Sequence, residues 1–380
     1  MVNVLNLLKK DMRRKNIDNK ALAPVVKKSP PSVSNYLNGK QHPDFLTFRR
    51  IVEHVTHTEN RLNFCFNLYI ADIAKIDDLH LMLDYCSHQT KNNMLRRTIR
   101  RIKAIDPDNK IARLYELIDK RNSYKIKSEK MYLSILNMED ERENPKYTTL
   151  KKICHLYCFA DKRDFEMVDL MGKEALKGVW YIKEDSTKLS FMLRIKEAIA
   201  NSHLRKNNVD TARKMAFDIL KLSYQSEFPL IHDAMLQLLS QSYLFENPEL
   251  SLEYITMAVH NFENSPTMKN NLMRRRALEM THDFIQITLG NFDNLYLTSD
   301  AELAYYNVKI GNSELALEIL ENIKLKNGKL TAFQLLYKAM ATNSQQDYFE
   351  ALKEFQHNSD YFYVAMFEKE IFSNKTTLIV

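Results

Sequence analysis

Glycine scarcity is the feature that most constrains this chain, because its 380 residues include only 6 glycines. The P-loop and the dinucleotide-binding turn need clustered glycines, since their backbone N–H groups must approach a phosphate closely. No GxGxxG, GxxxxGKS or GxxxxGKT pattern occurs in the sequence. β-Sandwiches and barrels also need frequent turns, many of them with glycine. We therefore expect an all-α protein, without a bound cofactor, whose apolar residues (45%) line amphipathic helices.

Positive charge is concentrated near the N-terminus. Residues 1–60 contain 11 Lys and Arg against 5 Asp and Glu, and residues 91–130 contain 13 against 5. Residues 131–380 are slightly acidic, with 29 against 34, so the net charge of +7 belongs to the first third of the chain. This asymmetry indicates a polyanionic partner at one end of the molecule.

Residues 1–60 are predicted to form four short helices. Ser29 stands before two prolines, and a serine N-cap followed by proline in the first turn is a strong helix start. That helix should end at Gly39, because glycine readily adopts the left-handed conformation after a helix. Asn19 and Asp44 are the predicted N-caps of the helices on either side.

This arrangement is typical of a helix-turn-helix DNA-binding domain. Residues 21–23 belong to the supporting helix, and residues 32–38 form the recognition helix with Val33 and Leu37 toward the core. Short polar side chains on its outer face suit base edges, and flanking lysines suit phosphates. The predicted DNA-binding residues are Lys27, Lys28, Ser32, Ser34, Asn35, Asn38 and Lys40. The alternative is a polar surface on a small helical cap.

A second basic stretch covers residues 91–103. Arg96 and Arg100, like Arg97 and Arg101, are four residues apart, which places positive charge along a helix. Either this is an ordinary solvated face, or it adds phosphate contacts to those of the first 60 residues.

From about residue 110 the chain shows repeated helical hairpins. Short polar turns are followed by helices with a small or apolar residue at Ala212, Leu252, Ala316 and Ala351, at intervals of 40, 64 and 35 residues. Two of these intervals approach the period of tetratricopeptide repeats, about 34 residues, and the long one leaves room for an irregular hairpin. Stacked hairpins of this kind form a superhelical array with a concave groove.

No catalytic motif stands out, and we expect a protein that is not an enzyme. The 4 cysteines do not form a disulfide framework, and Cys154 and Cys158 are expected to pack as small apolar residues. Asp77 and Asp78 are expected on a solvated helix face. No leader pattern or membrane-spanning segment is apparent, so we expect no membrane partner and a location in a reducing cytoplasm.

The residues from Ser34 to Lys40, from Phe45 to Ile51 and from His357 to Tyr363 resemble the AimR family, the arbitrium peptide receptors of temperate Bacillus phages. The resemblance implies a homodimer whose peptide-free form binds operator DNA and activates a gene for a regulator of lysogeny. It also implies that a short signalling oligopeptide, a hexapeptide containing arginine and ending in Gly-Ala, binds in the repeat groove and disfavours the DNA-bound state.

The resemblance also suggests peptide-binding positions. Asn201 and Arg205 lie one turn apart, Gln241 stands where relatives tend to have Asn, and Leu230 replaces a peptide-contacting Arg. Asp360 matches a family aspartate that would pair with the peptide's arginine. The full predicted set is Asn201, Arg205, Gln241, Thr298 and Asp360.

The predicted division is a helix-turn-helix domain over 1–60 and a tetratricopeptide-like domain over 61–380, with the peptide groove at about 150–365. By resemblance, a C-terminal segment at about 362–380 joins the dimer. Its predicted contacts are Phe362, Met366, Phe367, Leu378, Ile379 and Val380. The alternative function is a Rap-type, peptide-controlled regulator or repeat scaffold that contacts other proteins and not DNA.

Overall fold

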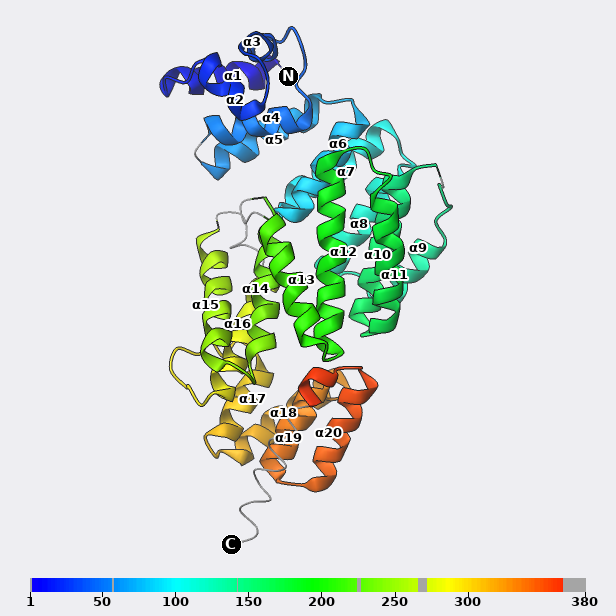
Figure 1. Cartoon of the computed structure of the whole chain (residues 1–380), viewed down its shortest axis with the longest axis vertical. Coiled ribbons are helices and arrows are strands. Elements are labelled where there is room, and N and C mark those ends of the chain that lie inside the picture. The colour runs from blue at the N-terminus through cyan, green and yellow to red at the C-terminus, as the bar shows by residue number, and fades with distance from the viewer. Residues whose placement is uncertain (1, 57, 142, 224–226, 266–271, 365–380) are drawn as a thin grey trace.

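The fold is helical throughout the residues that the computed structural model describes, which are 2–56, 58–141, 143–223, 227–265 and 272–364. Within these ranges every regular element is an α-helix, labelled α1 to α20 in Figure 1, and no strand occurs. The helices progress along the long axis, from α1–α4 at one end to α18–α20 at the other. The predicted all-α fold is confirmed.

Four short helices form the N-terminal end: α1 (Val2–Arg14), α2 (Asn19–Val26), α3 (Pro30–Leu37) and α4 (Phe45–Val55). Ser29 and Asp44 cap α3 and α4, as predicted, by accepting backbone N–H bonds. The cap of α2 is Asp18, and Asn19 is the first residue of that helix, so the prediction for Asn19 was wrong by one position.

One predicted surface carboxylate is buried instead. Asp78 is only 5% exposed, and its Oδ1 accepts a 3.0 Å hydrogen bond from the backbone N–H of Phe45, the first residue of α4. Burial raises the pKa of Asp78. A carboxylate from α6 therefore satisfies an N–H group at the start of a helix that is distant in sequence.

Five further helices follow: α5 (Glu59–Asp72), α6 (Ile76–His88), α7 (Asn92–Ile105), α8 (Lys110–Asn122) and α9 (Ser128–Leu136). The helical hairpins then begin. Their helices are α10 (Pro145–Asp161), α11 (Phe165–Val179), α12 (Asp185–Arg205), α13 (Val209–Leu222), α14 (Pro229–Tyr243), α15 (Pro248–Asn264), α16 (Leu272–Thr288), α17 (Asp300–Lys309), α18 (Ser313–Asn327), α19 (Ala332–Thr342) and α20 (Gln345–His357).

The long interval between Leu252 and Ala316 contains α16, an extended loop and the short helix α17. Asp283 holds this loop, because its two carboxylate oxygens accept hydrogen bonds from the backbone N–H groups of Tyr296 and Leu297 at 3.0 and 2.7 Å. The irregular hairpin expected here is thus a helix packed beside a loop.

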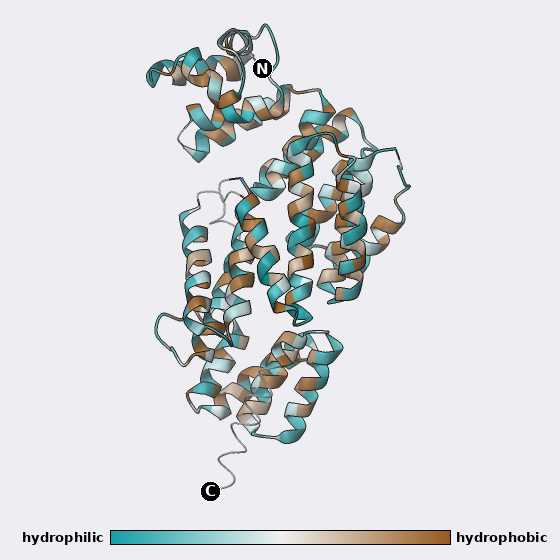
Figure 2. Ribbon diagram, viewed as in Figure 1, coloured by the Kyte–Doolittle hydropathy of each residue, from teal (hydrophilic) through white to brown (hydrophobic). Residues whose placement is uncertain are grey.

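Two groups of buried apolar residues make up the interior. The first core runs from Val4 to Ile199, and the second from Leu193 to Tyr363. Figure 2 shows apolar residues as stripes along the helices between hydrophilic faces, as packing of each helix on its neighbours requires.

Helix α12 belongs to both cores. Ile195 and Ile199 pack in the first core, whereas Ala200 and Leu204 pack in the second. The remaining face of α12 carries polar residues, and this face positions the candidate ligand site described below. None of the helices in the described part of the chain is long and apolar enough to cross a membrane.

Candidate functional site

The surface around α2 and α3 is basic and exposed. Val33 and Leu37 are buried, as the helix-turn-helix reading required, whereas Asn35 and the flanking Lys28 and Lys40 are exposed. Side chains at these positions are accessible to a partner that approaches the N-terminal end of the molecule.

The other predicted DNA-binding residues take part in local hydrogen bonds. The Oγ atoms of Ser29 and Ser32 are 2.9 Å apart. The amide of Asn38 donates to Oγ of Ser34 at 3.2 Å and accepts from Nζ of Lys9 in α1 at 2.8 Å. Lys9 was not among the predicted residues, because only the packing of α1 beside α3 brings it to this face.

Lys27 occupies a strained position at the C-terminal end of α2. Its φ is +55°, and its backbone N–H bonds to the carbonyls of Ala23 and Pro24 to close the helix. Glycine is the usual residue at such a position, since an L side chain disfavours the left-handed region.

The second basic stretch, in α7, divides into two kinds of residue. Arg96 pairs with Asp119 at 2.8 Å, and Nε of Arg101 donates to the carbonyl of Ile73 at 3.1 Å, so both contribute to the fold. Arg97 and Arg100 are exposed, which fits either prediction for this stretch, a solvated helix face or added phosphate contacts.

A row of polar residues lies on one face of α12: Arg194, Glu197, Asn201 and Arg205, which we call the α12 stripe. Spacings of three and four residues place these side chains above one another. Three of them border a cavity of about 300 Å³ between α12 and its neighbours.

The cavity combines charged and apolar walls. Arg121 from α8 and Arg274 from α16 join Arg194 and Glu197 on the charged side, and Leu230 lies on the apolar side. A concave, partly apolar space with few convergent polar groups is typical of a ligand site. The residues that line the cavity come from seven helices, so only the folded arrangement brings them together.

The cations of the cavity are held by other groups. Arg121 pairs with Asp161 through Nη2, and Nη2 of Arg194 is 3.2 Å from Oδ1 of Asp84. Glu197 is the carboxylate of the cavity, and burial raises its pKa to about 7, although Arg274, Arg194 and Arg121 oppose the shift.

Three predicted peptide-binding residues meet in one place. Arg205 contacts Asp360 at 3.5 Å through Nη1 and Gln241 at 3.3 Å through Nη2. Arg163 contacts the same Asp360 oxygen, Oδ2, at 3.1 Å, and the Arg205 guanidinium lies 5.2 Å from the ring centre of Tyr363. We call these five residues the Asp360 cluster.

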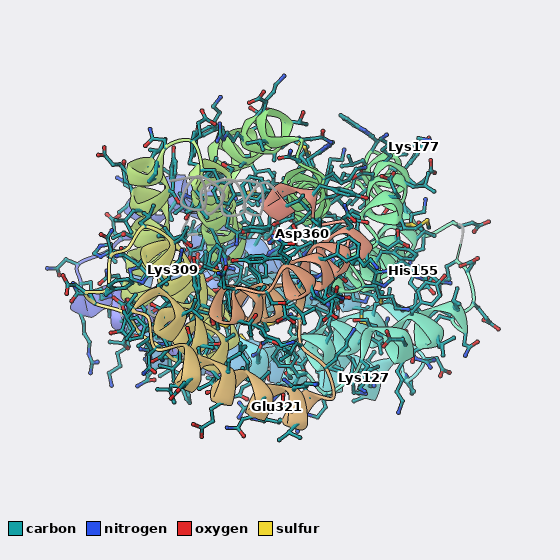
Figure 3. The ribbon with its side chains drawn as sticks, turned by 90° about the horizontal axis from the view of Figure 1, so that it is seen from below. Lys127, His155, Lys177, Lys309, Glu321 and Asp360 are labelled. Carbon is teal, nitrogen blue, oxygen red and sulfur yellow. The ribbon has the colours of Figure 1, made fainter. Side chains whose placement is uncertain are left out.

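Asp360 is fully buried in this cluster. Figure 3, which views the molecule from below, labels Asp360 near the middle of the view, with Lys177 and Glu321 nearer its edge. Its carboxylate, expected to face a ligand arginine, is paired with two arginines of its own chain. Arg163 had no sequence signal, because it is separated from Asp360 by 197 residues.

The remaining predicted positions lie apart from the cluster. Asn201 borders the cavity, and its amide donates to the carbonyl of Glu197 at 3.0 Å. Thr298 lies in the loop between α16 and α17, where its hydroxyl donates to Glu279 at 3.2 Å. The structure therefore brings Arg205, Gln241 and Asp360 together and places Asn201 one turn away.

A buried Ser–His–Asp group beside the cavity does not have the geometry of a catalytic triad. Nε2 of His88 is 2.5 Å from Oγ of Ser190 and 3.4 Å from Oδ1 of Asp84. In a triad the serine and the aspartate bond to opposite ring nitrogens. Here both face the same nitrogen, so the group is a buried polar network that supports Arg194.

Among the predicted dimer contacts, Phe362 is buried in its own chain, with its ring centre 5.4 Å from that of Phe245. Its side chain therefore offers no exposed surface to a second copy. Met366, Phe367, Leu378, Ile379 and Val380 lie outside the described residues. Cys154 and Cys158 are buried and free, as predicted.

The sequence of this chain is similar to a known family and to a relative from another organism. Residues 59–371 match the sequence model of a family described as AimR transcriptional regulator-like. A relative, the uncharacterized protein pXO2-35 of Bacillus anthracis, is 25% identical over 249 residues, which are 63% of this chain and 92% of that protein.

Two solved structures share the fold. A structure titled phAimR-Ligand has a TM-score of 0.69 at 14% identity and covers 83% of this chain and 97% of its own. A selenomethionine phAimR structure has a TM-score of 0.67 at 15% identity, with coverage of 96% and 95%.

Proposed function

This chain belongs to the AimR transcriptional regulator-like family, as its sequence resemblance indicated, and from that premise we propose that it is a peptide-responsive, dimeric DNA-binding regulator of the phage lysis–lysogeny decision. The peptide-free form binds operator DNA and activates a regulator of lysogeny, and an oligopeptide disfavours the DNA-bound state. The four buried, free cysteines suit the reducing cytoplasm of a bacterial host.

The observation that carries the proposal is the α12 stripe with its cavity. A cavity of about 300 Å³ with apolar and polar walls suits part of an extended oligopeptide. Asn201 can both donate to and accept from a peptide backbone. Glu197 offers a carboxylate to a cationic side chain, such as the arginine of the expected hexapeptide with its Gly-Ala end.

The N-terminal helices support the DNA part of the proposal. Residues 1–60 form the DNA-binding domain, with α3 as the recognition helix, and residues 61–380 form the repeat domain. Asn35 is exposed on α3 between basic residues that suit phosphates. A homodimer would present two such helices to two half-sites, with the C-terminal segment joining the protomers.

Peptide and DNA are linked by a population shift. The peptide must bind the DNA-incompetent arrangement more tightly than the DNA-bound one, by about 1–3 kcal/mol for a typical coupling. Since α12 belongs to both cores, a ligand on its polar face contacts the boundary between them.

Fluorescence anisotropy with labelled promoter DNA from the phage that encodes the protein tests the proposal. We expect salt-sensitive binding at low micromolar protein or below, and release on addition of the hexapeptide encoded downstream of the gene. Absence of DNA binding, together with peptide binding, would support the Rap-type alternative of a regulator that contacts proteins. Absence of both would contradict the proposal.

A further inference from the structure

The Asp360 cluster has more positive than negative charge. Two guanidinium groups, those of Arg163 and Arg205, share a single carboxylate oxygen of Asp360. Burial and the charge of Arg205 lower the pKa of Arg163, although Asp360 opposes this shift. One positive charge of the cluster is therefore left without a counter-charge inside it.

Neighbouring carboxylates are engaged with other groups. Asp169 and Glu166 both contact Lys206 at 2.8 Å. Glu354 accepts a hydrogen bond from the Asn358 amide at 3.2 Å and lies 3.9 Å from Lys329. Its effect on the pKa of Arg163 is smaller than that of Asp360. A negative charge that balances the cluster thus has to come from outside this neighbourhood.

Arg163 has a backbone conformation that arginine does not favour, which indicates that the guanidinium of this residue has a role of its own. Its φ is +59° in the turn between α10 and α11. The turns after α12, α17 and α19 place Asn207, Gly311 and Asn343 at positive φ, and these residue types tolerate that region. Arginine is not stabilised by this conformation, but the turn directs the guanidinium of Arg163 toward Asp360, which lies in a distant part of the chain.

The cluster also has an unused acceptor. Oδ1 of Asp360 is buried and has no hydrogen-bond partner among the described residues, which is costly for a carboxylate oxygen. The cluster lies beside the cavity, because Arg205 follows Asn201 by one turn of α12 and Phe165, two residues after Arg163, borders the cavity.

We propose that Arg163 and Arg205 bind the free C-terminal carboxylate of the peptide ligand, while Oδ1 of Asp360 accepts the N–H of its last peptide bond. Two guanidinium charges then face two carboxylate charges, and the buried acceptor gains a donor. This inference rests on the proposed function, since it assumes a peptide in the cavity. It reverses the expectation for Asp360, because the cluster receives the anionic end of the peptide and not its arginine.

The probe is N-acetyl-Gly-Ala, which has a carboxylate and one adjacent N–H group, compared with its C-terminal amide. Thermal shifts of the full-length protein are measured with each compound up to about 50 mM. We expect the acid to stabilise the protein and the amide to bind about tenfold more weakly or not at all, because charge-assisted hydrogen bonds are lost. Equal effects of acid and amide, or no effect of the acid, would overturn the proposal.

Variants assign the effect to the cluster. Arg163→Gln should abolish the difference between acid and amide, Arg163→Lys should keep part of it, and Arg113→Gln, on an exposed part of α8, should keep all of it. If Arg163→Gln keeps the full difference between acid and amide, the proposal is overturned. If that variant does not fold, the comparison of acid and amide in the unmodified protein and in Arg163→Lys still tests the proposal. DNA binding is not involved, so failure here is distinct from failure of the proposed regulation.

Discussion

Nη1 of Arg163 lies 3.1 Å from Oδ2 of Asp360, although 197 residues separate them in the chain. The contact links the turn after α10 to the segment after α20, so it ties an early hairpin to the C-terminal end of the described chain. Asp360 is fully buried, whereas the Arg163 side chain is 40% exposed.

The two partners should therefore contribute unequally to stability. We expect Asp360→Asn to lower the free energy of unfolding by about 3 kcal/mol, because it leaves two guanidinium groups without their counter-charge. Arg163→Gln should cost about 1 kcal/mol, since Arg205 remains on Asp360 and Arg163 is partly solvated. Urea denaturation measures both, and equal costs would contradict this ranking.

Gly172 allows α11 to approach α12. A Cβ at this position would lie 2.7 Å from Cδ1 and 2.8 Å from Cγ1 of Ile199. We expect Gly172→Ala to destabilise the protein by about 1–2 kcal/mol, because overpacking outweighs the gain in helix propensity.

A double-mutant cycle tests the cause of that cost. Gly172→Ala should cost less in an Ile199→Ala background, which removes the two crowding atoms. Gly311→Ala is the control, because its cost arises from a φ of +85° with open space around it, and it should not depend on Ile199. Strict additivity at Gly172 would argue against the clash.

At Lys27, the substitution that stabilises the folded protein should weaken its binding to DNA. Lys27→Gly should raise the free energy of unfolding by about 0.5–1 kcal/mol, since glycine adopts the φ of +55° without strain. It should also weaken DNA binding and lower the slope of log K against log salt by about 0.9, the loss of one phosphate contact. Lys27→Ala should lower the slope equally without the stability gain, and an unchanged slope in both would remove Lys27 from the interface.

Asn35 should contribute to sequence discrimination. Asn35→Ala is expected to cost about 1–3 kcal/mol at the operator, because it removes side-chain hydrogen bonds to a base edge. Binding to unrelated DNA should be almost unaffected, and Asn6→Ala, at an exposed site on α1, serves as the control. Anisotropy titrations on both DNAs measure the difference, and a uniform loss would indicate a phosphate contact.

Glu197 should make stability depend on pH. Its pKa is raised by burial to about 7, above that of an unfolded glutamate, so the folded state binds the proton more tightly. The stability from this group is present at low pH and is lost as the pH rises through about 7.

Glu197→Gln mimics the protonated form. It should raise Tm relative to the unmodified protein by a small amount at pH 5 and by a larger amount at pH 8. Glu253→Gln, at an exposed site on α15, serves as the matched surface control. A constant difference for Glu197→Gln between pH 5 and pH 8 would show that its carboxyl titrates normally.

Local signals in the sequence were sufficient for three of the helix ends that we predicted within residues 1–60. Ser29 and Asp44 cap their helices, and Gly39 adopts positive φ where a stop was expected. These features depend on a few consecutive residues, so they can be recognised from sequence patterns. Asp18 and Asn19 are both good caps, and nothing local decided between them.

Contacts between distant segments could not be predicted in this way. Asp78 was assigned to the surface because its partner, the N–H of Phe45, belongs to another helix. The family resemblance suggested Arg205, Gln241 and Asp360 but not Arg163 or Glu197. Their importance depends on the curvature of the superhelix, which brings the turn after α10 toward the residues that follow α20.

The first core begins at Val4 and continues to Ile199, so the basic N-terminal helices share one packed interior with the helices that follow them. A head on a flexible tether would adjust its angle to DNA independently. Under the proposed function, the angle at which α3 meets DNA is set by its packing in the first core. In the regulator that we propose, a rotation at α12 would therefore displace α3, and the operator spacing that the dimer accepts would depend on the shape of the whole superhelix.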